Sequence, residues 1–247
     1  MLTRKLLLIF IILLAIVFVG LQVFELQAVA DYVRPVILPL LALLYYLAKK
    51  EKSSNFFYFL LFYSIGEISS LFSYYAQYSN FMNDLLYYGG NILFITAYVF
   101  LILEILKPMN IKKIFNRFTT YILIFAALDI YSIILVTDIA IKSELLSGFF
   151  DYLTEIVYNT VIMLLLTITL INYISSHTKK AMNLLLGALC IVFSEVIQVA
   201  YYYVSDQNIL SIAYSVLLVL AFTFFYIQTN LSYAESEVYE AMEELED

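Results

Sequence analysis

The chain has 247 residues, of which 64% are hydrophobic and only 13% are charged, and its mean hydropathy is +0.91. This composition excludes an ordinary soluble domain and indicates a membrane protein. The formal charge of −7 reflects an acidic segment, residues 232–247, rather than an acidic binding site. A single cysteine, Cys190, excludes a disulfide within the chain.

Long windows with few or no charges follow one another along the chain, and nearly every one can hold the ~20 residues that cross a bilayer. In chain order the predicted spans lie within residues 5–25, 27–49, 52–84, 84–107, 117–138, 149–173, 180–206 and 206–235. The second is the least regular, because it contains Pro35 and Pro39. The sequence therefore predicts an all-α polytopic membrane protein with eight transmembrane helices. Residues 1–231 form one membrane domain and 232–247 an acidic tail.

The basic residues predict the orientation of these spans. With eight spans, eleven of the thirteen lysines and arginines fall on one side, and only Arg34 and Lys142 fall on the other. The positive-inside rule places the basic side in the cytoplasm, so both termini are expected there. We expect a multi-pass protein of the cell membrane, plasma or inner. No basic amphipathic helix is present, so a nucleic-acid partner is not expected.

Two glutamates interrupt spans that are otherwise apolar. Glu67 lies in the third predicted span and Glu195 in the seventh. A carboxylate in hydrocarbon costs about 2.5 kcal/mol or more, so such a residue normally faces a cavity or a partner and marks a functional site. We therefore expect Glu67 and Glu195 to meet in one polar cavity.

The two glutamates also have similar neighbours. A polar residue follows three positions on, Ser70 and Gln198, and a tyrosine pair follows seven and eight positions on, at 74–75 and 202–203. A parallel repeat of four plus four helices would explain this similarity between the two segments. Chance similarity between apolar helices would explain it as well.

Other polar residues predict what surrounds the glutamates. Asp151, Glu155 and Asn159 share one face of the sixth span and should point into the bundle. Arg34 and Asn91 fall at a similar depth, which predicts a polar cavity in the outer half of the bundle. Asp129 and Glu104 fit better as hydrogen-bonded ties between helices.

Several kinds of site find no support in the residues. With one histidine, His177, and one cysteine, a metal site built from these residue types is excluded, and carboxylates alone are a weak alternative. The chain has no Gly-rich phosphate loop, G-x-S-x-G elbow or H-E-x-x-H motif. Retinal is not expected, because no lysine lies within a span. We predict neither a metal nor a cofactor.

Four short motifs resemble those of the YhhN family of eight-span membrane proteins. They are Arg34-Pro35, Ser64-Ile-Gly-Glu67, Gly89-Gly90-Asn91 with the following Ile-Leu-Phe94, and residues 187–195 ending in Ser194-Glu195. The characterised members of that family are lysoplasmalogenases, which hydrolyse the vinyl ether bond of lysoplasmalogens to a fatty aldehyde and a glycerophospho-base. The resemblance implies a hydrolase whose partner is a membrane lysophospholipid.

The chain departs from the family at three points. The family usually has Lys before the proline and Asp in both acidic motifs, where this chain has Arg34, Glu67 and Glu195. It also often has a His near the position of Ala97 and Tyr98. Glutamate reaches one methylene further than aspartate, so the same chemistry needs a slightly retracted helix or a different substrate.

The resemblance and the positions together predict residue roles. Glu67 and Glu195 would be the catalytic acid and base, one protonated and the other ionised. Arg34 would bind the lipid phosphate, and the other substrate-binding residues would be Ser64, Asn91, Glu155 and Ser194. Two alternatives stay open: a proton-coupled carrier, since buried acids also relay protons, and a non-catalytic scaffold or sensor.

Overall fold

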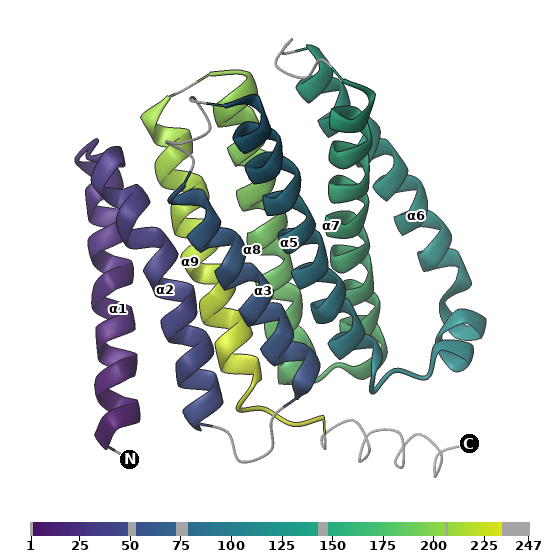
Figure 1. The fold of residues 1–247 in the computed structure, drawn as a ribbon. Helices are drawn as coiled ribbons and strands as arrows, with labels where there is room; N and C mark the ends of the chain where they lie inside the picture. The colour runs from purple at the N-terminus through teal and green to yellow at the C-terminus, as the bar shows by residue number, and fades with distance from the viewer. Residues whose placement is uncertain (1, 49–52, 73–78, 143–147, 206, 234–247) are drawn as a thin grey trace.

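The computed structural model of the chain describes residues 2–48, 53–72, 79–142, 148–205 and 207–233. These residues form eight helices that run alternately up and down (Figure 1). Their bounds are α1 (Leu2–Val23), α2 (Gln27–Ala48), α3 (Ser54–Ser70), α5 (Asn80–Leu106), α6 (Ile111–Lys142), α7 (Phe149–Ser176), α8 (Lys179–Tyr203) and α9 (Asn208–Gln228). The predicted all-α fold is confirmed. The acidic tail lies outside the described residues, apart from Ser232 and Tyr233.

Seven of the helices in the described residues are long and apolar enough to cross a membrane, and α3, with 17 residues, is the shortest of the eight. Large apolar side chains cover the outside of the bundle, including Ile16 (64% exposed) on α1 and Leu123 (66% exposed) on α6. Soluble proteins rarely expose apolar patches beyond a few hundred Å². The chain is therefore a multi-pass membrane protein.

α3 ends earlier than the charge-free window had suggested. The window predicted a span through the tyrosines at 74–75, but the helix stops at Ser70. The hydroxyls of Ser69 and Ser70 donate to the carbonyls of Gly66 and Glu67, at 2.6 and 2.7 Å. Serine side chains offer the backbone such alternative hydrogen bonds, which makes serine neutral to unfavourable inside a helix. The tyrosines at 74–75 lie outside the described residues, as do the side chains of those at 202–203.

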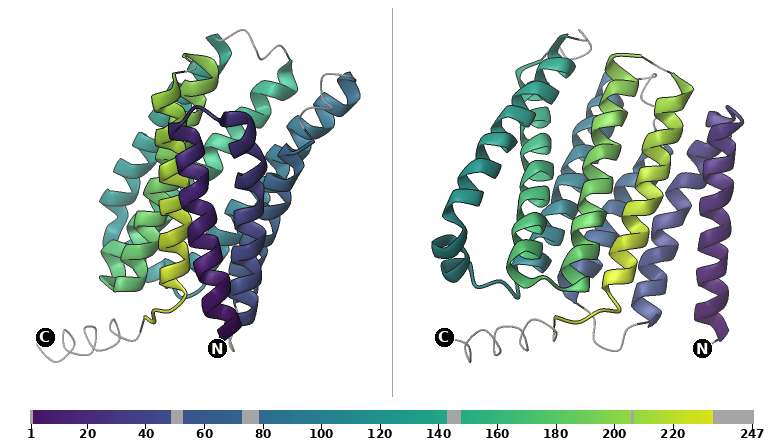
Figure 2. Two further views of the ribbon diagram at one scale, coloured as in Figure 1. Left: turned by 90° about the vertical axis from the view of Figure 1, so that its left-hand side faces the viewer. Right: turned by 180° about the vertical axis from the view of Figure 1, so that it is seen from behind.

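Within each half of the chain, helices that follow one another pack against one another. α1 contacts α2, α2 contacts α3 and α3 contacts α5, and in the same way α6, α7, α8 and α9 form a second series. The two series meet where α5 packs on α7 and α1 packs on α9, and also through aromatic rings of α3 and α9. The end of the bundle where α1 begins and α9 ends (Figures 1 and 2) is here called the basic end, because Arg4, Lys107 and Lys180 belong to it.

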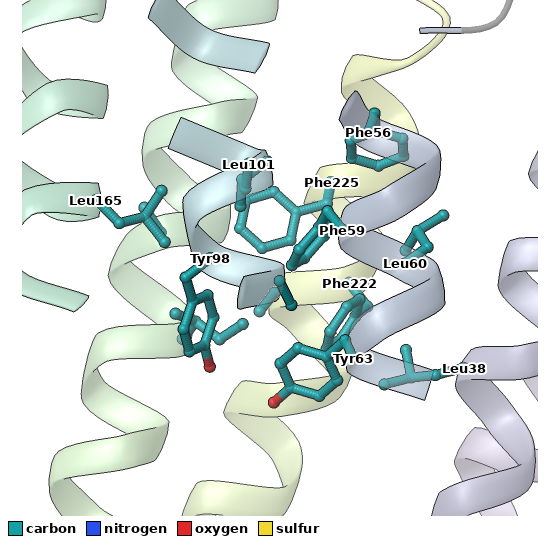
Figure 3. Close-up of a cluster of buried hydrophobic side chains, with 14 of the residues drawn as sticks. Leu38, Phe56, Phe59, Leu60, Tyr63, Tyr98, Leu101, Leu165, Phe222 and Phe225 are labelled. Carbon is teal, nitrogen blue, oxygen red and sulfur yellow. The ribbon is translucent and has the colours of Figure 1, made fainter. Parts of the chain in front are cut away.

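The middle of the bundle is filled by aromatic rings (Figure 3). Phe59 on α3 stacks on Phe222 of α9, with ring centroids 5.8 Å apart, and meets Phe225 edge-on at 5.5 Å. Tyr63 and Tyr98 extend this cluster, and both are almost fully buried. Their hydroxyl oxygens point toward the same end of the cluster (Figure 3). The cluster therefore has a polar edge, and the candidate site lies there.

Gly187 makes close packing of α8 on α9 possible. A Cβ atom at this position would lie 2.5 Å from Cε1 of Phe225, whose ring is held by the aromatic cluster. We expect Gly187→Ala to cost about 1–3 kcal/mol by overpacking and so to lower the melting temperature by several degrees. Thermal unfolding in detergent measures this. Gly89→Ala is the matched control, because no atom lies within 4 Å of its Cβ position, and it should not lower the melting temperature. Equal melting temperatures for the two variants would contradict the packing role.

Candidate functional site

Arg34 and Glu67 form a buried ion pair between α2 and α3. Nη2 of Arg34 lies 2.8 Å from Oε1 of Glu67, and the glutamate side chain is only 1% exposed. Arg34 lies two turns inside α2 rather than at its end, and Pro35 and Pro39 follow it in the same helix. Neither proline has an N–H group, so the carbonyls four residues before each lose their helical partner. Because the carboxylate of Glu67 is almost fully buried and paired with Arg34, it faces the inside of the bundle and not lipid.

The ion pair leaves two polar atoms unsatisfied. Within the described part of the chain, Nε of Arg34 and Oε2 of Glu67 are buried and have no hydrogen-bond partner. A buried polar atom without a partner costs about 1–3 kcal/mol, and more when the group is charged. One is a donor and the other an acceptor. A molecule that carries an acceptor next to a hydroxyl group would satisfy both.

Glu195 lies on α8 beside the polar edge of the aromatic cluster. The hydroxyl of Tyr98 donates to Oε1 of Glu195 at 2.7 Å, and Tyr158 of α7 also interacts with this carboxylate. Arg34 and Glu67 lie near enough to Glu195 to interact with it electrostatically. A carboxylate held by a fixed hydroxyl is oriented for proton transfer, provided that a reacting group can reach its other oxygen.

A polar cavity of about 340 Å³ opens beside Glu195. Four helices besides α8 supply the rest of its polar wall: α2 with Arg34, α3 with Tyr63, α5 with Tyr87 and Asn91, and α7 with Glu155 and Tyr158. We call this space the polar cavity. It brings together four of the predicted site residues: Arg34, Asn91, Glu155 and Glu195.

A second cavity, of about 320 Å³, lies between α1, α2 and α9. Its wall is formed almost entirely by apolar side chains, such as Ile11, Leu38 and Leu218. The charged residues in that wall are Arg34 and Glu67. We call this space the apolar cavity. Arg34 lines both cavities and so stands at the boundary between a polar and an apolar compartment.

The two glutamates do not share a cavity, contrary to expectation. Glu67 lines the apolar cavity and Glu195 lines the polar cavity, with Arg34 in the wall of both. Similar sequence contexts therefore have different surroundings in the fold. α2 offers a cation to Glu67, whereas α5 and α7 offer hydroxyls to Glu195.

Ser64 and Ser194 lie outside both cavities. The hydroxyl of Ser64 donates to the carbonyl of Leu60 at 2.6 Å, within its own helix. That of Ser194 donates to the carbonyl of Tyr214 at 2.8 Å and ties α8 to α9. This geometry gives no support to the substrate-binding role predicted for these two serines.

The polar stripe on α7 points into the bundle as expected. Glu155 and Asn159 are buried, and the hydroxyls of Tyr88 and Tyr87 donate to Asp151 and Glu155 at 2.6 and 3.3 Å.

The two acids expected to form hydrogen bonds between helices do so. Thr167 donates to Asp129 at 2.8 Å, and Ser53 donates to Glu104.

No individual tyrosine was predicted as a site residue, yet Tyr63, Tyr87 and Tyr158 line the polar cavity. Tyr98 is not part of that wall, but it contacts the site most directly, because its hydroxyl donates to Glu195. The sequence did contain a signal for Tyr98. It falls near the position where the YhhN family, whose motifs this chain resembles, often has a histidine.

Among the described residues, no group of three or more His, Cys, Asp or Glu side chains is placed to hold a metal ion. The site consists of carboxylates, hydroxyls, an amide and one guanidinium, which is a set suited to proton transfer and to binding an anion. In comparisons with protein-family models, with curated proteins and with solved structures, no match to this chain was found.

Proposed function

We propose that the protein is a membrane-embedded hydrolase that cleaves the vinyl ether bond of a lysophospholipid, as the resemblance to the YhhN family implies. One observation carries this proposal: Arg34 stands between a polar and an apolar cavity, with Glu67 on one side and Glu195 on the other. In such a lipid the vinyl ether bond joins the hydrocarbon chain to the polar glycerol part. An amphiphile lying across this boundary would place that bond beside the two carboxylates.

The chemistry needs one acid and one base. A protonated carboxyl gives its proton to the alkenyl carbon that does not bear oxygen, and the double bond becomes an oxocarbenium ion. Water then attacks the carbon that bears oxygen and passes a proton to the other carboxylate. The resulting hemiacetal collapses to a fatty aldehyde and a free glycerol hydroxyl. Glu67 and Glu195 are the pair that we assign to these steps, without dividing the two roles between them.

The other residues of the polar cavity would bind the head of the lipid. The guanidinium of Arg34 is suited to the phosphate, because it offers planar, paired donors. Asn91 can hydrogen-bond to the glycerol part, and Glu155 adds a negative charge that would favour a cationic base. The partner in this proposal is a membrane lysophospholipid, and the chemistry uses no cofactor.

We propose the following topology for this enzyme. All eight helices, including the short α3, cross the membrane, and the basic end with both termini faces the cytoplasm. The protein would then be a multi-pass protein of the cell membrane. The parallel four-plus-four repeat remains part of this proposal, with α1–α5 and α6–α9 as its two halves.

The test is aldehyde release by the purified protein in detergent. A lysoplasmalogen should yield fatty aldehyde, whereas the matched lysophospholipid with an ester-linked chain should not. Aldehyde release without any ion gradient supports the enzyme. Uptake of a substrate into vesicles driven by a pH gradient, with no chemical change, would instead identify a carrier and overturn the proposal.

A further inference from the structure

The apolar cavity has the composition of a site for one hydrocarbon chain. Its volume of about 320 Å³ lies at the small end of ligand pockets. Along α1 its wall extends from Phe18 to Leu8, a rise of about 15 Å at 1.5 Å per residue. The lining therefore runs from the level of the ion pair toward the basic end.

The charged pair in the wall of the apolar cavity indicates what kind of molecule carries the hydrocarbon chain. Nε of Arg34 and Oε2 of Glu67 are a buried donor and a buried acceptor, neither with a partner in the described residues. An unsubstituted hydrocarbon would leave both unsatisfied. A lysophospholipid carries a phosphate, which accepts, and a glycerol hydroxyl, which donates. It matches both atoms and brings a single chain.

We infer that the apolar cavity binds the chain of a single-chain lysophospholipid whose head contacts Arg34 and Glu67, and that this chain lies along α1 past Ala15. This inference deepens the proposed function and rests on it for the identity of the lipid, but binding alone tests it. Ala15 is the residue of α1 at which a larger side chain would best test this inference. It lies in the cavity wall between Phe18 and Ile11, and its small side chain leaves room for a chain to pass.

The experiment measures binding, not turnover. Purified full-length protein is titrated with ester-linked lysophosphatidylcholines that carry octanoyl, dodecanoyl or palmitoyl chains, and bound lipid is counted by native mass spectrometry. Affinity should rise with chain length in the natural protein. Ala15→Phe should weaken binding of the palmitoyl lipid about tenfold or more, the loss expected when a few methylene groups lose their burial. Binding of the octanoyl lipid should change little.

Ala127→Phe is the matched control, because Ala127 is an exposed alanine in the middle of α6, far along the chain from the cavity. It should leave all three affinities unchanged. If Ala15→Phe does not fold, Ala15→Leu replaces it, and the dependence of the natural protein on chain length already tests the cavity. Equal binding of the palmitoyl lipid by the natural protein and a folded Ala15 variant would overturn the inference. So would binding of free palmitate in place of the lysolipid.

This failure is distinguishable from failure of the proposed function. Chain-length-dependent binding without aldehyde release from a lysoplasmalogen would retain the lipid site and remove the hydrolase. Aldehyde release that Ala15→Phe leaves unchanged for every chain length would retain the hydrolase and remove this chain site.

Discussion

Glu195→Gln is expected to reduce aldehyde release from a lysoplasmalogen by about 10²–10⁴-fold, the usual contribution of a general acid or base. The substitution keeps the shape of the side chain and an oxygen that can accept from Tyr98, so it removes the titrating group and little else. Glutamine can neither deliver nor accept the proton that the reaction moves. Turnover by purified protein in detergent is the measurement, with the melting temperature as a check of folding.

Asp129→Asn is the control for Glu195→Gln. Asp129 is also a half-buried acid in the middle of a helix, but it binds Thr167 and lines neither cavity. Its replacement should leave turnover within a fewfold of the natural protein.

Tyr98→Phe should give a loss of turnover between those of Asp129→Asn and Glu195→Gln, because it frees the carboxylate of Glu195 without removing it. Unchanged turnover in Glu195→Gln would remove Glu195 from the mechanism.

The helices could largely be predicted from the sequence, because the membrane imposes a simple rule on composition. Charged residues bound the spans, and the start of α2 at Gln27 and of α7 at Phe149 agree with expectation. The rule fails at the end of α3. A charge-free window shows where a helix is permitted, and it does not mark the residue at which the helix ends.

The candidate site could be predicted only in part. That Glu67 and Glu195 face the interior follows from the cost of a charge in hydrocarbon. Their partners do not follow, because a partner depends on how each helix is rotated against its neighbours. The guanidinium of Arg34 and the hydroxyl of Tyr98 reach these glutamates from 33 and 97 positions away in the chain. Periodicity within one helix carries no information about either contact.

Removing one member of the buried ion pair is expected to have the largest effect on stability. Glu67→Leu leaves the guanidinium of Arg34 buried without its counter-charge, and uncompensated buried charges cost about 3–5 kcal/mol. For a chain of this length that corresponds to a fall in melting temperature of roughly 10 °C. Thermal unfolding in detergent is the measurement. Asp138→Asn is the control, because the exposed pair of Asp138 and Lys142 is worth at most about 1 kcal/mol.

The double variant Arg34→Met/Glu67→Leu distinguishes a structural role of the Arg34–Glu67 ion pair from a functional role. Replacing both charges by apolar side chains of similar volume removes the desolvation cost together with the attraction, so stability should return to that of the natural protein or exceed it. If the pair exists to bind the lipid, this stable variant will still bind no palmitoyl lysophosphatidylcholine and release no aldehyde. A double variant that is stable and active would show that the two cavities work without a charge between them. The boundary at Arg34 would then have no part in the chemistry.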